Sequence, residues 1–289
     1  MAIPSRSGKF TLEDLKNVKS VSWSETRRVS LREPQIFVEE KDGFKFDYLW
    51  HPNANADHKR LFVLFSGDAM RKTNDPPVFQ RWSWAKFFPG HCLFVSDPTL
   101  YLNDRLGLAW YAGNSDFDPM PHISATVNSI TEQLNIKSEH VCTYGSSGGG
   151  FASIRALLFL PDALSVAINP QTCITKYEKK SVERYLRLAY DTDDRALALK
   201  KYHTRLNLLE HAETLRSKKI LLIQNRLDTH HYEEHYKPLC EVLGYDVNQK
   251  CSDDMHLQRL LFSHEAGHGK AEPQEVFSQA MEIIIRWSS

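Results

Sequence analysis

Short, continuous hydrophobic runs recur along the chain from residue 61 onward, and longer segments of helical character separate them. A hydrophobic run without polar alternation is typical of a strand that is buried on both faces of a sheet. The predicted buried strands are Leu61–Phe65, His91–Ser96, His140–Tyr144, Leu164–Ile168, Ile220–Gln224 and Leu257–Ser263. The helical segments are Phe79–Phe88, Ile123–Leu134, Gly150–Leu160, Tyr232–Leu243 and Glu275–Trp287. This alternation predicts an α/β fold whose central sheet is mostly parallel and carries helices on both faces.

The pattern before residue 61 is different. The first 30 residues are polar and predict irregular structure, with a short helix near Leu12–Val18. Gln35–Glu40 and Phe44–Trp50 are strand-like and flank Asp42-Gly43, a dipeptide typical of tight hairpin turns. We expect these two strands to pair as a hairpin.

One long segment interrupts the alternation of strands and helices. Residues 172–217 are charged, rich in Leu, Lys, Arg and Ala, and separate the strands Leu164–Ile168 and Ile220–Gln224. The segment predicts a helical insertion or cap over the sheet, within a single domain of residues 1–289. The alternative is a group of surface helices that takes no part in catalysis.

Composition narrows the class of protein. Of the 289 residues, 42% are hydrophobic, which is ample for a large core. The 36 basic residues balance the 36 acidic residues, so neither nucleic acid nor an anionic membrane is an expected partner. No apolar stretch reaches the roughly 18–20 residues that span a bilayer, and the N-terminus lacks the apolar segment of a secretory signal. The five cysteines are scattered and never in CxxC spacing, which favours a reducing, cytoplasmic location.

The strongest chemical signal is the sequence Gly145-Ser146-Ser147-Gly148-Gly149, which fits G-x-S-x-G with Ser147 at its centre. A buried strand precedes it and a helix follows, the context in which this motif presents a nucleophilic serine on a sharp turn. Glycine is needed on both sides because a bulkier residue would clash with the adjoining strand or helix. Centring the motif on Ser146 would lose the glycine on its N-terminal side, so Ser147 is the predicted nucleophile.

This strand, turn and helix resemble the nucleophile elbow of the α/β-hydrolase superfamily. The resemblance covers roughly residues 35–289 and makes His140–Tyr144 the fifth strand, directly before the nucleophile. In this superfamily the acid and then the base follow the nucleophile along the chain. The resemblance therefore implies a catalytic triad, in which the base removes the serine proton and the acid orients the base.

Asp228 is the expected acid and His268 the expected base. Asp228 follows the strand Ile220–Gln224, so it lies at the carboxyl end of the sheet, as Ser147 does. His268 lies between two glycines on a loop before the last helix, where a close approach to the nucleophile is possible. The alternative acids are Glu233, Glu234, Asp253 and Asp254, and the alternative base is His264.

The resemblance also implies an oxyanion hole made of two backbone N–H groups. One is expected from Gly148, and the other from the loop after the third strand, Leu61–Phe65, near Asp68. This loop reads Ser66-Gly67-Asp68 and has no HGGG motif. The difference argues against close kinship with the HGGG esterases and lipases.

A second histidine cluster offers a different chemistry. His231, Glu234 and His235 fit H-x-x-E-H, which resembles the inverted zincin motif and would place two zinc ligands on one helix face. The motif directly follows Asp228, where the fold expects a loop and a surface helix, and Glu241 is the one candidate for a further glutamate ligand. We therefore expect no metal here, but a partly exposed helix near the mouth of the site.

The sequence indicates less about the substrate than about the catalytic residues. Tyr101, Trp110 and Tyr111 follow the fourth strand, His91–Ser96, and are the candidate pocket residues, with core packing as the alternative.

The first candidate function is hydrolysis of an ester or related acyl bond in a small molecule or saccharide, through an acyl-enzyme on Ser147 and without a cofactor. The second is O-acyl transfer, for example from acetyl-CoA to a saccharide hydroxyl; the Gly-rich elbow and Ser-Gly-Asp loop loosely resemble bacterial saccharide-modifying members of the superfamily. The third is a non-catalytic binding module that has kept the fold.

Overall fold

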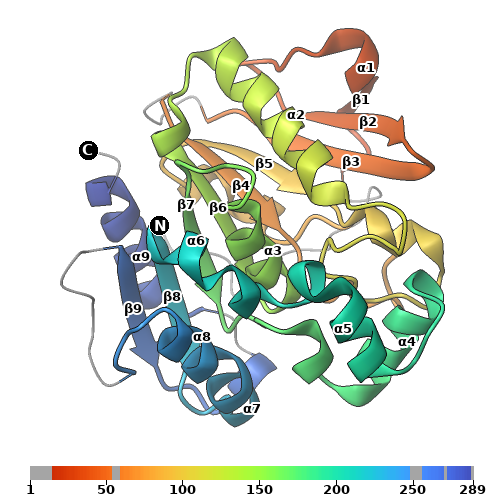
Figure 1. The fold of residues 1–289 in the computed structure, drawn as a ribbon. Helices are drawn as coiled ribbons and strands as arrows, with labels where there is room; N and C mark the ends of the chain where they lie inside the picture. The colour runs from red at the N-terminus through yellow and green to blue at the C-terminus, as the bar shows by residue number, and fades with distance from the viewer. Residues whose placement is uncertain (1–14, 54–58, 248–255, 270–271, 288–289) are drawn as a thin grey trace.

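The computed structural model describes residues 15–53, 59–247, 256–269 and 272–287. Over these residues the chain forms a nine-stranded sheet in the order β1-β2-β3-β5-β4-β6-β7-β8-β9, with helices on both sides (Figure 1). The strands are β1 (Lys19–Ser22), β2 (Gln35–Lys41), β3 (Phe44–His51), β4 (Leu61–Phe65), β5 (His91–Val95), β6 (Val141–Ser146), β7 (Leu164–Ile168), β8 (Ile220–Asn225) and β9 (Leu257–Phe262). The α-helices are α1 (Trp23–Thr26), α2 (Pro119–Leu134), α3 (Gly148–Ala156), α4 (Lys179–Ala189), α5 (Arg195–Leu206), α6 (Ala212–Arg216), α7 (Thr229–His231), α8 (Lys237–Val242) and α9 (Gln274–Trp287). Shorter 3-10 and π turns are η1 (Trp82–Phe87), η2 (Pro98–Leu102), η3 (Ser138–His140), η4 (Ile174–Lys176), η5 (Leu208–His211), η6 (Tyr232–Tyr236) and η7 (Gly267–Gly269).

The sheet is parallel except around β3. This strand pairs antiparallel with β2 and with β5, and the other neighbouring strands pair in parallel. The β2–β3 hairpin turns at Asp42 and Gly43, whose φ angles of 51° and 77° are the left-handed values that a two-residue hairpin turn needs. The predicted hairpin and the predicted, mostly parallel α/β sheet are confirmed.

The hydrophobic core lies in two layers, one on each face of the sheet. Every residue of β4, β5 and β7 is buried, as expected for strands that are covered on both sides. One layer packs residues of α2, α3, α4 and α8 against the sheet, and the other packs η1 and α9. Full burial of one Leu or Ile side chain contributes about 1.5–3 kcal/mol relative to exposure, so these layers stabilise the framework that carries the site. Within the described ranges, no helix combines the length and apolarity that crossing a bilayer requires.

Two predicted helices differ from the observed elements. The helix expected over Phe79–Phe88 is only the 3-10 turn η1, because Arg81 has a left-handed backbone at its start and Pro89 favours extended backbone at its end. The helix expected over Tyr232–Leu243 begins as the π turn η6. Pro238 has no N–H to donate to the carbonyl four residues earlier, so the wider turn replaces the α-helical one.

The stretch before residue 30 is more ordered than its polar composition predicts. It contains β1 and α1, because parallel pairing with β2 gives the backbone of β1 its hydrogen-bond partners. Residues 15–18 of the helix expected over Leu12–Val18 form a turn and a bend, and the rest of that segment lies outside the described residues.

The segment between β7 and β8 contains α4, α5 and α6. The helix α4 packs on the loops that follow β5. The Tyr185 hydroxyl donates to Gly113 O at 3.0 Å, and Arg184 Nη1 donates to Arg105 O at 3.3 Å. These bonds join the segment to the loop that carries Trp110, but whether it acts as a cap stays a prediction.

Candidate active site

Ser147 lies at the sharp turn between β6 and α3, with φ 57° and ψ −122°. A non-glycine residue in such a conformation costs about 1–3 kcal/mol and needs support from its surroundings. The Ser147 N–H donates to Ile168 O at 2.9 Å, and Ser147 O accepts from Phe151 N at 3.1 Å. These bonds to β7 and α3 hold the strained backbone that presents the serine side chain.

The glycines beside the serine are required by close backbone contacts. A Cβ atom at Gly145 would lie 2.2 Å from Gly149 O, and a Cβ atom at Gly149 would lie 2.4 Å from Phe65 O. Both contacts are with backbone, so a side chain at either position would have to displace the turn itself. Strands β4 and β6 and helix α3 therefore meet closely because these two residues have no side chains.

Gly149→Ala is expected to lower the free energy of unfolding by about 1–3 kcal/mol, because the added methyl group overpacks the contact with Phe65 O. Urea denaturation followed by tryptophan fluorescence measures the change. Gly269→Ala is the matched control, since a Cβ atom at Gly269 meets nothing within 4 Å. Equal denaturation midpoints for the two variants would contradict the prediction.

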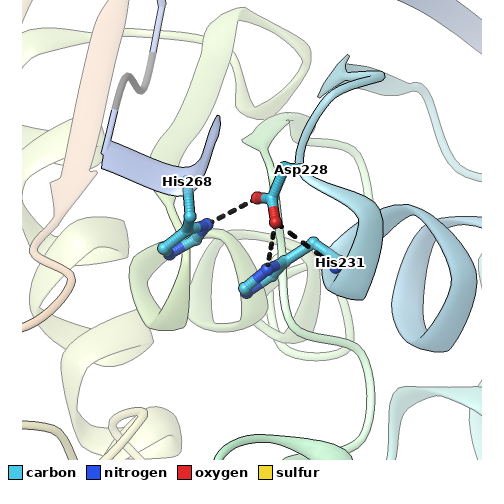
Figure 2. Close-up of side chains that lie close together, drawn as sticks. All are labelled: Asp228, His231 and His268. Atoms are coloured by element: carbon cyan, nitrogen blue, oxygen red, sulfur yellow. Dashed lines mark hydrogen bonds and ion pairs between the residues drawn. The ribbon is translucent and has the colours of Figure 1, made fainter. Parts of the chain in front are cut away.

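Ser147, His268 and Asp228 form a continuous hydrogen-bonded chain. The distances are 2.9 Å from Ser147 Oγ to His268 Nε2 and 2.7 Å from His268 Nδ1 to Asp228 Oδ2. Figure 2 shows the Asp228 end of this chain. The Asp228 side chain is 5% exposed and that of His268 is 34% exposed, so the chain runs from a buried carboxylate to an accessible imidazole. The structure thus brings the three residues chosen from the sequence together, in an order suited to proton transfer from the serine.

The alternative residues have other partners. Ser146 Oγ accepts from Arg81 Nη2 at 3.0 Å, and His264 Nδ1 accepts from Ala266 N at 3.1 Å within its own loop. Of the alternative acids, Glu233 and Glu234 are exposed and pair with Lys237 and Lys176, and Asp253 and Asp254 lie outside the described residues.

Asn225, at the end of β8, holds the loops of both the acid and the base. Its Nδ2 donates to His264 O and Gly267 O at 2.9 Å each. Its Oδ1 accepts from Leu227 N at 3.1 Å and from His264 N at 3.0 Å. Leu227 precedes the acid and Gly267 precedes the base, so one buried amide sets their separation. Sequence reasoning missed Asn225, although a polar residue at the carboxyl end of a buried strand was a usable signal.

A buried ion pair lies beside the elbow. Arg81 Nε donates to Glu272 Oε1 and Arg81 Nη2 donates to Glu272 Oε2, at 2.8 Å each. Nη2 also donates to Ser146 Oγ. The Tyr144 hydroxyl donates to Glu272 Oε1 at 3.0 Å. The side chains of Arg81 and Glu272 are 6% and 0% exposed. The pair therefore ties the segment after the base to the strand before the nucleophile, a link that sequence reasoning missed.

A second histidine, His231, contacts the acid. Its Nδ1 lies 3.0 Å from Asp228 Oδ1, and its ring stacks on that of His268, with centroids 3.8 Å apart and an interplanar angle of 7° (Figure 2). Burial lowers the His231 pKa from 6.5 to about 4, although the hydrogen bond to Asp228 opposes this, so the imidazole is neutral at pH 7. Burial of Asp228 favours its neutral form, but hydrogen bonds from His231 and His268 outweigh that effect and hold its pKa below the usual range.

Gln171 follows β7 and connects the serine to His231. Its Nε2 lies 2.8 Å from Ser147 Oγ and 2.8 Å from His231 Nε2, and its Oε1 accepts from Trp110 Nε1 at 3.0 Å. Gln171 and Trp110 are fully buried. Sequence reasoning missed Gln171 because a glutamine after a strand has no distinctive pattern. Its place at the carboxyl edge of the sheet was the one available signal.

The residues predicted for the oxyanion hole lie on two segments beside the serine. Gly148 begins α3, and the first N–H groups of a helix have no partner within the helix. A Cβ atom at Gly67 would lie 3.5 Å from Ser147 Cβ, so the loop that contains Asp68 runs beside the nucleophile. Gln80 holds this loop, accepting from Gly67 N and donating to Asp68 O at 2.9 Å each. That Gly148 and Asp68 bind an oxyanion stays a prediction.

The candidate pocket residues have different positions. Trp110 lies at the site and supports Gln171. Tyr111 is fully buried, and its hydroxyl donates to Val95 O and accepts from Ser66 N, at 2.7 Å each, so it supports the loop after β4 from inside the core. The Tyr101 hydroxyl is hydrogen-bonded to Asp47 on β3. The structure therefore does not bring these two tyrosine hydroxyl groups to the serine.

Tyr177 is an aromatic residue beside the site that sequence reasoning missed. Its half-buried ring lies 6.0 Å from the ring of Trp110 and 5.6 Å from that of His231, measured between centroids. It belongs to the segment between β7 and β8, which was expected to cover the site.

The residues of the H-x-x-E-H motif do not converge on one point. His235 Nδ1 accepts from Thr172 N at 3.2 Å, and Glu234 is exposed and lies 3.7 Å from Lys176 Nζ. The rings of His231 and His235 are buried and Glu233 and Glu234 are exposed, so the segment is partly exposed, as expected. A different set, Asp228, His231 and His268, has possible metal-ligating atoms within 4.8 Å of one another. In this set the carboxylate accepts hydrogen bonds from both imidazoles.

Acid is expected to destabilise the protein as the pH falls from about 6 to about 4. Burial lowers the pKa of His231 to about 4 and that of His235 to about 3, from 6.5. In this range the unfolded chain binds two protons that the folded protein does not, so stability falls with pH. Asp97 offsets one of these two protons. Burial raises its pKa from 3.8 to about 6, so the folded protein binds this proton at a higher pH than the unfolded chain does. These three groups leave about one extra proton on the unfolded chain, so the free energy of unfolding should fall by roughly 1 kcal/mol per pH unit.

Urea denaturation at half-unit steps between pH 6 and pH 4.5 measures this slope. His235→Phe removes one of the two histidines, so the slope from these groups should fall to near zero in that variant. A wild-type free energy of unfolding that does not change over the interval would contradict the prediction.

No known family profile and no curated protein sequence matches the chain, but solved structures do. Dipeptidyl peptidase 4 of Porphyromonas gingivalis matches with a TM-score of 0.59 at 11% identity, over 88% of this chain and 35% of that one. A variant of the capsule O-acetyltransferase of Neisseria meningitidis serogroup A, in complex with CoA, matches with a TM-score of 0.57 at 16% identity, over 95% and 100% of the two chains. The S-formylglutathione hydrolase of Agrobacterium tumefaciens matches with a TM-score of 0.53 at 11% identity, over 90% and 96%.

The chain spans about a third of the length of the dipeptidyl peptidase and nearly all of the other two proteins. Identities this low concern the fold and carry no activity with them. The neighbours support an α/β-hydrolase fold. The sheet order and the strand–turn–helix elbow at Ser147 agree with it. The chain is an α/β-hydrolase-fold protein.

Proposed function

We propose that the protein is a serine hydrolase that cleaves an ester or related acyl bond through an acyl-enzyme on Ser147. The observation that carries the proposal is the hydrogen-bonded chain from Ser147 Oγ through His268 to Asp228. A fold alone needs no such chain, and the strained backbone of Ser147 is of the kind that clusters at active sites. The half-buried serine and the partly exposed His268 ring leave the reacting end of the chain accessible.

In the proposed reaction, Ser147 Oγ attacks the acyl carbon while His268 Nε2 takes the hydroxyl proton. The carbonyl oxygen gains the negative charge, and the backbone N–H groups of Gly148 and of the loop at Asp68 bind it. When the intermediate collapses, the leaving alcohol takes the proton from His268. Water then gives a proton to His268 and attacks the acyl-enzyme, and Ser147 Oγ leaves with that proton. Asp228 holds the imidazole and stabilises its charged form in both halves of the reaction.

O-acyl transfer to a saccharide hydroxyl is the second candidate. It is supported by the match to the capsule O-acetyltransferase, which extends over the whole of that chain. The two reactions share the acyl-enzyme and differ in what attacks it, since the acceptor hydroxyl takes the place of water and acetyl-CoA would be the donor. For either reaction we propose a cytoplasmic location, because Cys92, Cys142, Cys173 and Cys240 are free thiols.

Labelling with a fluorophosphonate, followed by peptide mass spectrometry, tests the acyl-enzyme. We expect the label on Ser147 of the wild type, no label on that residue's peptide in Ser147→Ala, and little label in His268→Ala. Ser146→Ala is the matched control and should still be labelled, because its hydroxyl faces Arg81 and not the base. A folded wild type that is not labelled would contradict the proposal and favour a non-catalytic module.

The same preparation separates hydrolysis from transfer. Turnover of p-nitrophenyl acetate without an added acceptor supports the hydrolase. Acetylation of Ser147 by acetyl-CoA that is discharged only when an oligosaccharide is added supports the transferase.

A further inference from the structure

Five side chains close a ring of hydrogen bonds around the nucleophile. One path runs from Asp228 through His268 to Ser147, and a second runs from Asp228 through His231 and Gln171 to the same serine oxygen. The reaction proposed above uses only the first path. We propose that Gln171 is a further catalytic residue, which donates an N–H to Ser147 Oγ, and that His231 is the positioning residue that orients its amide. This inference rests on the proposed serine chemistry.

Trp110 fixes the orientation of the Gln171 amide. The indole N–H can only donate, so the amide atom 3.0 Å from Trp110 Nε1 must be the oxygen. The Gln171 NH₂ group then points the other way and has two hydrogens for two neighbours, Ser147 Oγ and His231 Nε2, each at 2.8 Å. Gln171 and Trp110 are 0% exposed and His231 is 2% exposed, so water does not compete for these bonds.

The amide and the Asp228 carboxylate require the same proton position on His231. Its Nε2 accepts from Gln171, so its proton lies on Nδ1 and is donated to Asp228 Oδ1. A second proton on His231 would set an N–H against the Gln171 NH₂ group and a positive charge against the stacked His268 ring. The nearby titratable groups are the imidazoles of His230 and His235 and the phenol of Tyr177. The burial that lowers the His231 pKa to about 4 agrees with a neutral ring at pH 7.

At the nucleophile, the Gln171 bond directs the hydroxyl proton. Ser147 Oγ accepts from Gln171, so its own O–H points to His268 Nε2 at 2.9 Å, the direction needed for proton transfer. During attack, Oγ loses its proton to His268 and forms the bond to the acyl carbon, with Gln171 N–H stabilising the negative charge on Oγ. When the acyl-enzyme is released, Oγ takes back the electron pair of the breaking bond, and the same N–H stabilises it again. The donor acts on the nucleophile oxygen and is separate from the oxyanion hole.

Gln171→Met tests the catalytic role, because methionine has a similar length and no donor. We expect kcat for p-nitrophenyl acetate and the fluorophosphonate labelling rate to fall about 10²-fold, the scale of losing one donor to a developing charge, with KM little changed. Gln224→Met is the matched control, since Gln224 is equally buried and its Nε2 donates to Asn225 O instead of the serine. Gln171→Met that is labelled and turned over at the rate of Gln224→Met would overturn the catalytic role.

Nitrogen-15 NMR of the histidine rings at pH 7 tests the orientation without relying on activity. We expect the wild-type His231 signal of a neutral ring protonated on Nδ1. In Gln171→Met the Asp228 carboxylate should keep the proton on Nδ1, and the Nε2 signal should shift because that nitrogen has lost its donor. A wild-type His231 that is protonated on Nε2, or on both nitrogens, would overturn the inferred amide orientation. A wild type that is neither labelled nor active would overturn the proposed function and with it the catalytic role of Gln171, while the NMR result still decides the positioning role of His231.

Discussion

The Asp228→Asn variant is expected to lose about 10⁴-fold in kcat. Two imidazoles share the carboxylate, with His268 on Oδ2 and His231 on Oδ1. Asparagine offers one oxygen and one NH₂ group, so one of the two rings must move its proton to the other nitrogen. If His268 does so, its Nε2 cannot accept the Ser147 proton, a tautomer fault that costs about 10⁴ in kcat in triads of this type. If His231 does so, its Nε2–H meets the NH₂ group of Gln171.

Steady-state turnover of p-nitrophenyl acetate at pH 7 measures this loss, and urea denaturation checks that the variant folds. Asparagine caps a helix as well as aspartate does, so the start of α7 should be preserved. Asp194→Asn is the matched control, because Asp194 caps α5 in the same way and is exposed. A kcat for Asp228→Asn within tenfold of this control would show that the carboxylate has no essential role.

Arg81→Met is expected to lower the free energy of unfolding by about 3–5 kcal/mol. The substitution leaves the Glu272 carboxylate buried beside the elbow without its bidentate partner, and an uncompensated buried charge costs this much. Loss of the ion pair should also disturb the active site, because Glu272 follows the base by four residues and Arg81 contacts Ser146. We therefore expect kcat to fall together with stability.

The double variant Arg81→Met, Glu272→Met separates the charge from the packing. Replacing both partners of a buried pair by apolar side chains is often neutral, so most of the lost stability should return. Arg187→Met removes one partner of an ion pair whose side chains are both more than 60% exposed, and it should cost less than about 1 kcal/mol. A double variant less stable than Arg81→Met would contradict this account.

The sequence predicted the framework well where a pattern was local. Buried strands are continuous hydrophobic runs, and the elbow at Ser147 is marked by glycines that its close backbone contacts require. Asp228 and His268 could be chosen because each follows a recognisable strand in an expected order. The short turns η1 and η6 were mistaken for α-helices, since their apolar spacing does not report the prolines that limit them.

The rest of the site depends on contacts between distant parts of the chain. Gln171 meets Ser147 and His231 only because the ends of β7, β6 and β8 lie at one edge of the sheet. Arg81 and Glu272 are separated by 191 positions and have no motif in common. The sequence singles out His231 only as part of a zinc motif that was considered and rejected, because sequence spacing shows which residues share a helix and not which carboxylate lies opposite them.

Because of Asn225, the loops of the acid and the base should lose their structure together during unfolding. Its amide bonds to the backbone of both loops, and its own N–H donates to Asn169 Oδ1 at the end of β7. Loops on a protein surface usually open locally, at a lower free energy than the core. Here the two loops are fastened to the centre of the sheet through one side chain. They should therefore keep their geometry until the strands separate, so that loss of activity in denaturant coincides with cooperative unfolding of the whole sheet.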